Sequence, residues 1–142
     1  MVNEFSRTEL LIGKEGIKRL QNATVMVLGV GGVGSHCIEA LARSGVGKLI
    51  LVDNDKVSLT NINRQSIAYQ STVGEYKTKL MEDRIHDICH STEVITYEMF
   101  VLPDNLSELF EGKVDYIVDA IDTVTGKIEI IIKAKEAGTP VI

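Results

Sequence analysis

Cysteine, proline and aromatic residues are scarce in this chain of 142 residues. It has two cysteines, two prolines, no tryptophan and only 5% aromatic residues. Cys37 and Cys89 lie 52 residues apart and form no CxxC pair, which argues against both a zinc knuckle and a disulfide framework. We therefore expect free thiols and a reducing, cytoplasmic location.

Long apolar runs and an excess of positive charge are also missing. The longest apolar runs span three or four residues, so we expect no membrane span and no membrane partner. Fifteen Lys and Arg residues face 20 Asp and Glu residues, and the net charge is −5. Such a balance is not typical of a general nucleic-acid-binding surface, so any recognition of a nucleic acid must be local. The 44% of hydrophobic residues suffices for a packed core and excludes a disordered chain or a coiled coil.

Short apolar segments rich in Val, Ile and Leu alternate with amphipathic ones along the chain. This pattern predicts strands at 23–28, 48–52, 93–100 and 114–120, and a further strand starting within 139–142. It predicts helices at 7–20, 35–44, 74–90 and 127–137, and a short helix starting at 103–105. We expect an α/β fold: a Rossmann-like, doubly wound, mostly parallel sheet with helices on both faces, preceded by an N-terminal amphipathic helix. Residues 1–142 are interpreted as one nucleotide-binding domain. Because the sequence stops as a buried strand starts, we expect it to be the N-terminal part of a longer protein.

A glycine-rich turn follows the first predicted strand. Residues 29–34 read Gly-Val-Gly-Gly-Val-Gly, with a helix directly after them. The glycines Gly29, Gly31, Gly32 and Gly34 allow a tight turn and a close approach of backbone N–H groups to phosphate at a helix N-terminus. Asp53 ends the next strand, where a carboxylate can bind both hydroxyls of a ribose. The pattern predicts an adenine-nucleotide site without separating NAD from ATP, and the alternative is a tight turn with no ligand.

Further charged and polar residues follow the predicted strands at the same edge of the sheet. They are Asp55, Asn61, Arg64, Gln65, Lys77 at the start of a helix, and the pair Asp119 and Asp122. Arg64 and Lys77 can neutralise phosphate oxygens and Asp122 can hold Mg²⁺, a set that suits a triphosphate better than a dinucleotide. Three alternatives remain open. Arg64 pairs with Asp53 or Asp55, Lys77 is a solvated helix residue, or Asp119 and Asp122 cap the last helix.

In these residues together the chain resembles the ThiF/MoeB/HesA superfamily, which is related to ubiquitin-activating enzymes. The matching segments are GVGGVG at 29–34, LVDNDKVSLTNINRQ at 51–65, VGEYK at 73–77 and DAIDT at 119–123. The resemblance implies adenylation of a carboxylate with ATP and Mg²⁺. Within the superfamily the sequence is most similar to the tRNA threonylcarbamoyladenosine dehydratase branch. That resemblance implies tRNA as the partner and cyclisation of its threonylcarbamoyladenosine.

The resemblance also implies a role for each site residue. Gly29 to Gly34 would hold the phosphates and Asp53 the ribose, while Asn61, Arg64 and Lys77 would contact the triphosphate and Asp122 the metal. Arg7 matches an arginine that, in relatives, reaches the γ-phosphate bound by the other subunit of a homodimer. Three other functions remain open. They are adenylation of a ubiquitin-like sulfur-carrier protein, an NAD-dependent oxidoreductase, and a noncatalytic nucleotide-binding module.

Overall fold

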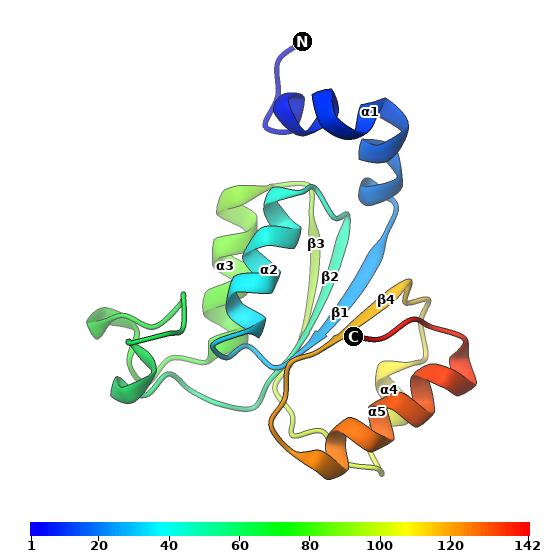
Figure 1. Ribbon diagram of the computed structural model, residues 1–142. Coiled ribbons are helices and arrows are strands. Elements are labelled where there is room, and N and C mark those ends of the chain that lie inside the picture. Colours follow the sequence, from blue (N-terminus) through cyan, green and yellow to red (C-terminus); the bar gives the residue numbers. More distant parts are fainter.

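Four parallel strands form the centre of the molecule, a computed structural model that describes residues 1–142 (Figure 1). The sheet has the order β3-β2-β1-β4. Its strands are β1 (Thr24–Leu28), β2 (Lys48–Val52), β3 (Glu93–Tyr97) and β4 (Tyr116–Asp119). β1 lies between β2 and β4 and pairs in parallel with both. The chain winds outward from β1 to β3 and then crosses to the other side of β1, so the predicted doubly wound α/β fold is confirmed.

Helices cover both faces of the sheet. Four helices form these layers: α2 (Gly34–Arg43), α3 (Lys77–Ile88), α4 (Leu106–Leu109) and α5 (Val124–Ala137). The first helix, α1 (Ser6–Gln21), lies beyond the amino-terminal ends of the strands (Figure 1). Val27 and Leu51 belong to one core cluster, which includes residues of α2 and α3. Leu28 and Val52, the next residue of each strand, belong to the second cluster, which includes residues of α4 and α5. Successive side chains of a strand point to opposite faces, so strands apolar throughout give two separate cores.

The register brings the carboxyl ends of the inner strands into one row. Leu28 of β1 is opposite Val52 of β2 and opposite Asp119 of β4. The segments that follow these three strands therefore leave the sheet side by side. This edge includes the point between β1 and β4 where the winding reverses, which is where ligands bind in open α/β sheets.

Several element boundaries differ from the predicted ones for local reasons. α1 is interrupted at Gly13, whose φ of 72° and ψ of 172° are not helical. β3 ends at Tyr97, because it is an edge strand that pairs with β2 alone. α5 begins at Val124 rather than at 127, with Gly126 buried. None of the helices has the combination of length and apolar character that crossing a membrane requires.

The predicted fifth strand is only partly formed. It contributes a single parallel bridge between Val141 and Ile117 of β4. Three backbone hydrogen bonds nevertheless join this segment to β4: the N–H groups of Ile117, Asp119 and Ile142 donate to the carbonyls of Pro140, Ile142 and Ile117. The segment therefore extends the sheet beside β4 without meeting the definition of a strand.

Candidate active site

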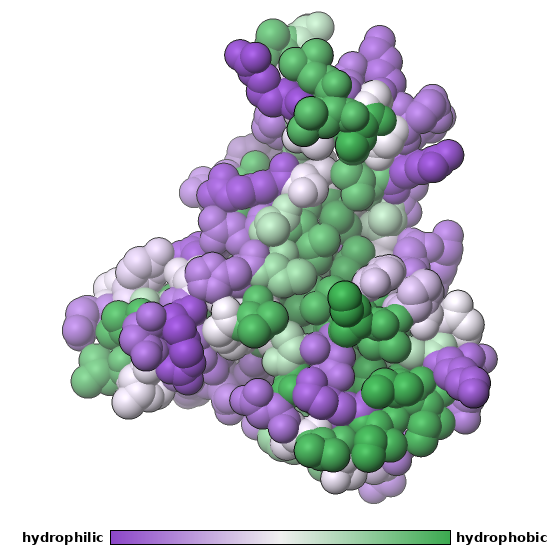
Figure 2. Space-filling view, in the orientation of Figure 1, coloured by the Kyte–Doolittle hydropathy of each residue, from purple (hydrophilic) through white to green (hydrophobic).

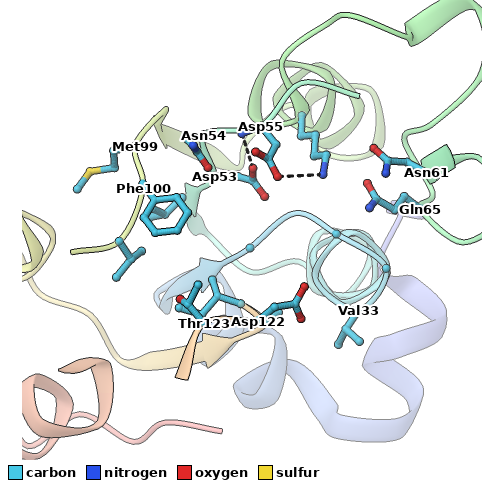
Figure 3. A pocket seen from close by; sticks show the side chains of 18 of the residues that line it. Val33, Asp53, Asn54, Asp55, Asn61, Gln65, Met99, Phe100, Asp122 and Thr123 are labelled. Atoms are coloured by element: carbon cyan, nitrogen blue, oxygen red, sulfur yellow. Dashed lines mark hydrogen bonds and ion pairs between the residues drawn. The ribbon is translucent and has the colours of Figure 1, made fainter. Parts of the chain in front are cut away.

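A cavity of about 640 Å³ opens at the carboxyl edge of the sheet (Figure 3). It lies where the segments that follow β1, β2, β3 and β4 come together. Ten of the twelve site residues predicted from the sequence line it: Gly29, Gly31, Gly32, Asp53, Asp55, Asn61, Arg64, Gln65, Lys77 and Asp122. Gly34 and Arg7 lie outside the lining. Residues that are up to 93 positions apart in the sequence thus share one concave site.

The glycine turn joins β1 to α2 through two positions that exclude a side chain. Gly29 has a φ of 98°, and a Cβ there would lie 2.4 Å from the carbonyl oxygen of Ala120. A Cβ on Gly34 would lie 1.7 Å from the carbonyl oxygen of Gly29. Gly34 is buried at the first position of α2, so its absence from the cavity wall reflects a packing role. Gly31 and Gly32 are the glycines of the turn that, with Gly29, face the cavity.

Asp53 connects the turn to the segment that follows β2. Its Oδ2 accepts a hydrogen bond of 2.7 Å from the N–H of Val30, and its Oδ1 accepts one of 2.7 Å from the N–H of Asp55. Both bonds fix the orientation of the carboxylate. Each oxygen keeps a further lone pair, so the carboxylate can still accept hydrogen bonds from two neighbouring hydroxyls.

The two predicted cations line the cavity in different ways. Lys77 is the first residue of α3; its side chain is only 7% exposed, and its Nζ lies 3.7 Å from Oδ2 of Asp55. Such burial rules out the solvated alternative for Lys77. Arg64 is exposed and donates from Nη1 to the Thr60 carbonyl and to Oδ1 of Asn63, at 3.0 and 2.7 Å. It forms no ion pair with Asp53 or Asp55, which rules out that alternative as well.

The two carboxylates at the carboxyl end of β4, Asp119 and Asp122, have separate environments. The Asp119 side chain is 9% exposed, and its Oδ1 is 3.1 Å from Nζ of Lys127. The same oxygen accepts a hydrogen bond from the N–H of Ile121. Asp119 therefore holds the turn that follows β4, and it does not line the cavity. Asp122 lines the cavity, and neither aspartate caps α5, whose N-cap is Thr123 without a side-chain cap.

An apolar wall, missed at the level of sequence, completes the cavity. Met99, Phe100 and Val101 follow β3 and line it. Figure 3 shows Met99 and Phe100 on one side of the site and Asn61 and Gln65 on the other. The sequence carries no motif at 99–101, and the prediction placed residues up to 100 within a strand. The one signal in the sequence that could have predicted this wall is an aromatic residue, Phe100, near the carboxyl end of a parallel strand. The cavity thus combines an apolar aromatic end with a polar, cationic end.

Arg7 lies far from this cavity in its own chain. α1 sits beside the amino-terminal ends of the strands in Figure 1, whereas the glycine turn and the cavity are at the carboxyl ends. The side chain of Arg7 is exposed. It therefore cannot reach the cavity of the same chain.

Comparison with known proteins decides the family. The ThiF family pattern matches residues 5–142. The chain belongs to the ThiF family. Among relatives of this ThiF-family chain, the tRNA threonylcarbamoyladenosine dehydratase of Bacillus subtilis is 50% identical over all 142 residues, which cover 56% of that protein. The protein of the same name from Escherichia coli is 37% identical over 138 residues, 97% of this chain and 52% of that protein. The chain spans about half the length of these curated relatives.

Solved structures agree with this assignment to the ThiF family. The crystal structure of the Escherichia coli tRNA N6-threonylcarbamoyladenosine dehydratase in complex with ATP superposes with a TM-score of 0.95 at 37% identity, covering 97% of this chain and 57% of that one. An adenylyltransferase and sulfurtransferase from Zea mays is 38% identical over 126 residues, 87% of this chain and 27% of that protein. The ThiF-family fold of this chain is therefore shared with proteins of both kinds.

The donor set of this ThiF-family site fits a magnesium ion held together with a polyphosphate. Asp122 lines the cavity and forms no hydrogen bond or ion pair within the chain, so its oxygens are free. The chain has no group of three His, Cys, Asp or Glu side chains arranged to hold a metal. Mg²⁺ commonly takes one or two protein carboxylates and completes its shell with phosphate oxygens and water. Asp122 is the residue that would supply the protein ligand here.

Proposed function

We propose that this chain is the ATP-binding, adenylating part of a tRNA threonylcarbamoyladenosine dehydratase in the cytoplasm. The observation that carries the proposal is the division of the cavity into an apolar end at Met99 and Phe100 and a cationic end at Arg64 and Lys77. The adenine of ATP would lie against Phe100, the ribose would bind Asp53, and the phosphates would follow Gly31 and Gly32 toward the cations. The 50% identity to the Bacillus subtilis dehydratase supports this choice of substrate.

The charges of the site suit attack on an α-phosphate. The threonyl carboxylate of the modified adenosine would attack the α-phosphorus, forming a new P–O bond while pyrophosphate leaves. Negative charge grows on the equatorial and leaving oxygens, where Arg64 and Lys77 can stabilise it. Mg²⁺ would neutralise phosphate charge beside Asp122. An internal nucleophile of the same side chain would then close a ring and release AMP, so the net change is loss of water coupled to ATP cleavage.

The placement of Arg7 supports a homodimer as the active unit. Arg7 is exposed on α1, at the end of the sheet opposite to its own cavity. It would instead complete the cavity of a second copy of the chain and contact the terminal phosphate there. Each site of such a dimer would contain residues of both subunits.

A ubiquitin-like sulfur-carrier protein is the second candidate substrate. The 38% identity to the Zea mays adenylyltransferase and sulfurtransferase favours it, because the cavity serves the same first step whichever carboxylate attacks. The two candidates differ in the acceptor, a nucleoside in tRNA or the C-terminus of a small protein.

ATP–pyrophosphate exchange measured with each acceptor tests the proposal. We expect exchange with tRNA that carries threonylcarbamoyladenosine and none with tRNA that lacks it or with a sulfur-carrier protein. Exchange with the sulfur carrier alone would select the second candidate. A calorimetric titration tests the cofactor, and tighter binding of NAD than of MgATP would contradict an adenylating function.

A further inference from the structure

The segment between β2 and α3 carries five predicted site residues but almost no regular structure. Within residues 53–76 the regular structure is limited to two short 3₁₀ turns, Leu59–Asn61 and Gln70–Thr72, and one antiparallel bridge between Lys56 and Tyr76. Arg64 is held mainly by this segment itself, through the Thr60 carbonyl and Asn63. The position of its guanidinium therefore depends on what holds the backbone at 64–66.

Three side chains of the neighbouring helices bind that backbone directly. Nε2 of His36 in α2 lies 3.0 Å from the Arg64 carbonyl oxygen. The Ser66 N–H donates to Oγ of Ser35, also in α2 and fully buried, at 3.2 Å. Nη1 of Arg84 in α3 donates to the Ser66 carbonyl oxygen at 2.7 Å. Within 64–66, the residues that line the cavity are Arg64 and Gln65. Gln65 lies between anchored peptide groups, and Arg64 directly precedes them.

Arg84 forms the most extensive of these three anchors. Its Nη1 also lies 3.3 Å from Oε2 of Glu39 in α2, and its Nη2 donates to the hydroxyl of Tyr69 at 3.1 Å. The side chain is only 23% exposed. One guanidinium therefore joins α2, α3 and two points of the segment, and a donor that carries charge makes a stronger hydrogen bond than a neutral one.

We propose that Arg84, together with His36 and Ser35, is a positioning residue that fixes Arg64 and Gln65 at the phosphate end of the cavity. The inference rests on the proposed adenylating function. Stabilisation of developing charge requires a donor already in place, and a displacement of about 1 Å costs on the order of 100-fold in rate. Ile67 and Ala68 are buried in the core below α2 and α3 and hold the segment near the sheet. The polar anchors then set the orientation of residues 64–66.

Hydrogen exchange in the nucleotide-free protein tests the anchor independently of any activity. Arg84→Gln should speed amide exchange within 61–72 by about tenfold or more, the loss expected for a hydrogen bond to a charged group. Arg43→Gln is the matched control. Arg43 also pairs with Glu39, at 3.0 Å, but contacts no part of the segment. Unchanged exchange in Arg84→Gln, or equal acceleration in Arg43→Gln, would overturn the proposal.

A double-mutant comparison of turnover tests the consequence for catalysis. In pyrophosphate exchange, Arg84→Gln should lower kcat by about tenfold or more and change the KM for ATP less. In an Arg64→Ala background the same change should cost less than about twofold, because the residue that it positions is gone. Equal losses in both backgrounds would refute a role through Arg64.

Two milder variants keep the test decisive if Arg84→Gln does not fold. Arg84→Lys keeps the charge and one donor, and should give intermediate exchange and turnover. Tyr69→Phe removes only the hydroxyl partner of Nη2, and should speed exchange at 61–72 less than Arg84→Lys does. The reverse order would contradict the assignment.

Failure of the proposed function can be distinguished from failure of this inference. If the parent protein shows no pyrophosphate exchange, the proposed function fails, while the hydrogen-exchange comparison still decides whether Arg84 anchors the segment.

Discussion

At the scale of single residues, similar side chains in the same motif have different partners. Asp119 and Asp122 are three positions apart, yet Asp119 is buried against Lys127 while Asp122 faces the cavity without a partner. Asp53 has both oxygens engaged by backbone N–H groups, and Asp55 is exposed beside Lys77. Under the proposed function, these environments lead us to expect different kinetic effects from Asp53 and Asp122.

Asp53 and Asp122 should therefore differ in their kinetic effects. Asp53→Ala removes contacts that are equal in bound ATP and in the transition state, so it should raise KM with a smaller change in kcat. Asp122→Ala should lower kcat, because its role beside the metal grows with the charge on the phosphates. Pyrophosphate exchange at varied MgATP concentration measures both constants. The same change in KM alone for both variants would contradict this division.

Arg64 should contribute to the rate rather than to stability. Its guanidinium bonds only to Thr60 and Asn63 within its own segment, so Arg64→Ala should change Tm little. Losing one preorganised donor costs about 100- to 1000-fold in kcat. Arg64→Lys keeps the charge without the planar fork and should recover only part of that loss. Near-normal exchange per folded molecule in Arg64→Ala would remove Arg64 from the mechanism.

Phe100 should contribute to nucleotide affinity. The residue is 49% exposed at the apolar end of the cavity, where an adenine can stack. Phe100→Ala should weaken MgATP binding by about 1–3 kcal/mol, and Phe100→Tyr should retain most of the affinity. Leu102 is equally exposed at 49% but does not line the cavity, so Leu102→Ala is the control. Equal calorimetric affinities of Phe100→Ala and Leu102→Ala would exclude stacking at Phe100.

At the scale of elements, the turn between β1 and α2 shows how one motif serves both packing and binding. Gly34 lies under the turn against the Gly29 carbonyl, whereas Gly31 faces the cavity. For a Cβ on Gly31, the nearest atom would be Nε2 of Gln65 at 3.8 Å, an ordinary contact distance. The two glycines are thus required for different physical reasons.

Alanine at these two positions should separate stability from binding. Gly34→Ala forces the turn and α2 apart and should lower the free energy of unfolding by about 1–3 kcal/mol or more. Gly31→Ala should leave Tm nearly unchanged and weaken MgATP binding about tenfold or more, because its methyl group keeps phosphate from the backbone N–H groups. Thermal melting and calorimetry of both variants check this. A large loss of Tm in Gly31→Ala would refute the distinction.

At the scale of the whole molecule, apolar side chains on the outer surfaces remain uncovered. Leu10 and Leu11 of α1 are exposed, as are Ile128 and Ile131 of α5. Figure 2 shows green residues gathered on the surface of α1 at the top and over α5 at the lower right. Large exposed apolar patches commonly mark interaction surfaces. They accord with the proposed assembly in which Arg7 of α1 enters the site of a second copy.

Mixing two inactive variants tests this assembly. Arg7→Ala and Asp122→Ala should each be nearly inactive alone. After mixing equal amounts and allowing subunits to exchange, half of the dimers are mixed and each has one intact site, so about a quarter of the sites should be active. Pyrophosphate exchange of the mixture measures this recovery. No recovery, in a mixture shown by mass spectrometry to contain mixed dimers, would contradict a role for Arg7 across the interface.

The sequence by itself determined the order of strands and helices along the chain, the parallel sheet and the edge of the sheet at which the candidate site lies. Buried parallel strands leave continuous apolar runs, and the glycine turn and Asp53 have a fixed place relative to two of those runs. The element boundaries were less predictable. The end of β3 at residue 97 and the extent of the segment at 139–142 depended on pairing with neighbouring strands, and the start of α5 at residue 124 depended on the burial of Gly126.

Only the tertiary structure decided which polar side chains face the cavity and which are used elsewhere. In the folded chain Asp119 forms an ion pair with Lys127, Asp122 faces the cavity without a partner, and Phe100 lines the cavity wall. The tertiary structure also brought Arg84 against the backbone at Ser66, 18 residues away in the sequence. Each of these side-chain placements depends on contacts between segments that are distant in the sequence, or on residues that belong to no sequence motif. The physical reason is that local patterns determine how a segment folds, whereas the partner of a side chain depends on how the segments pack.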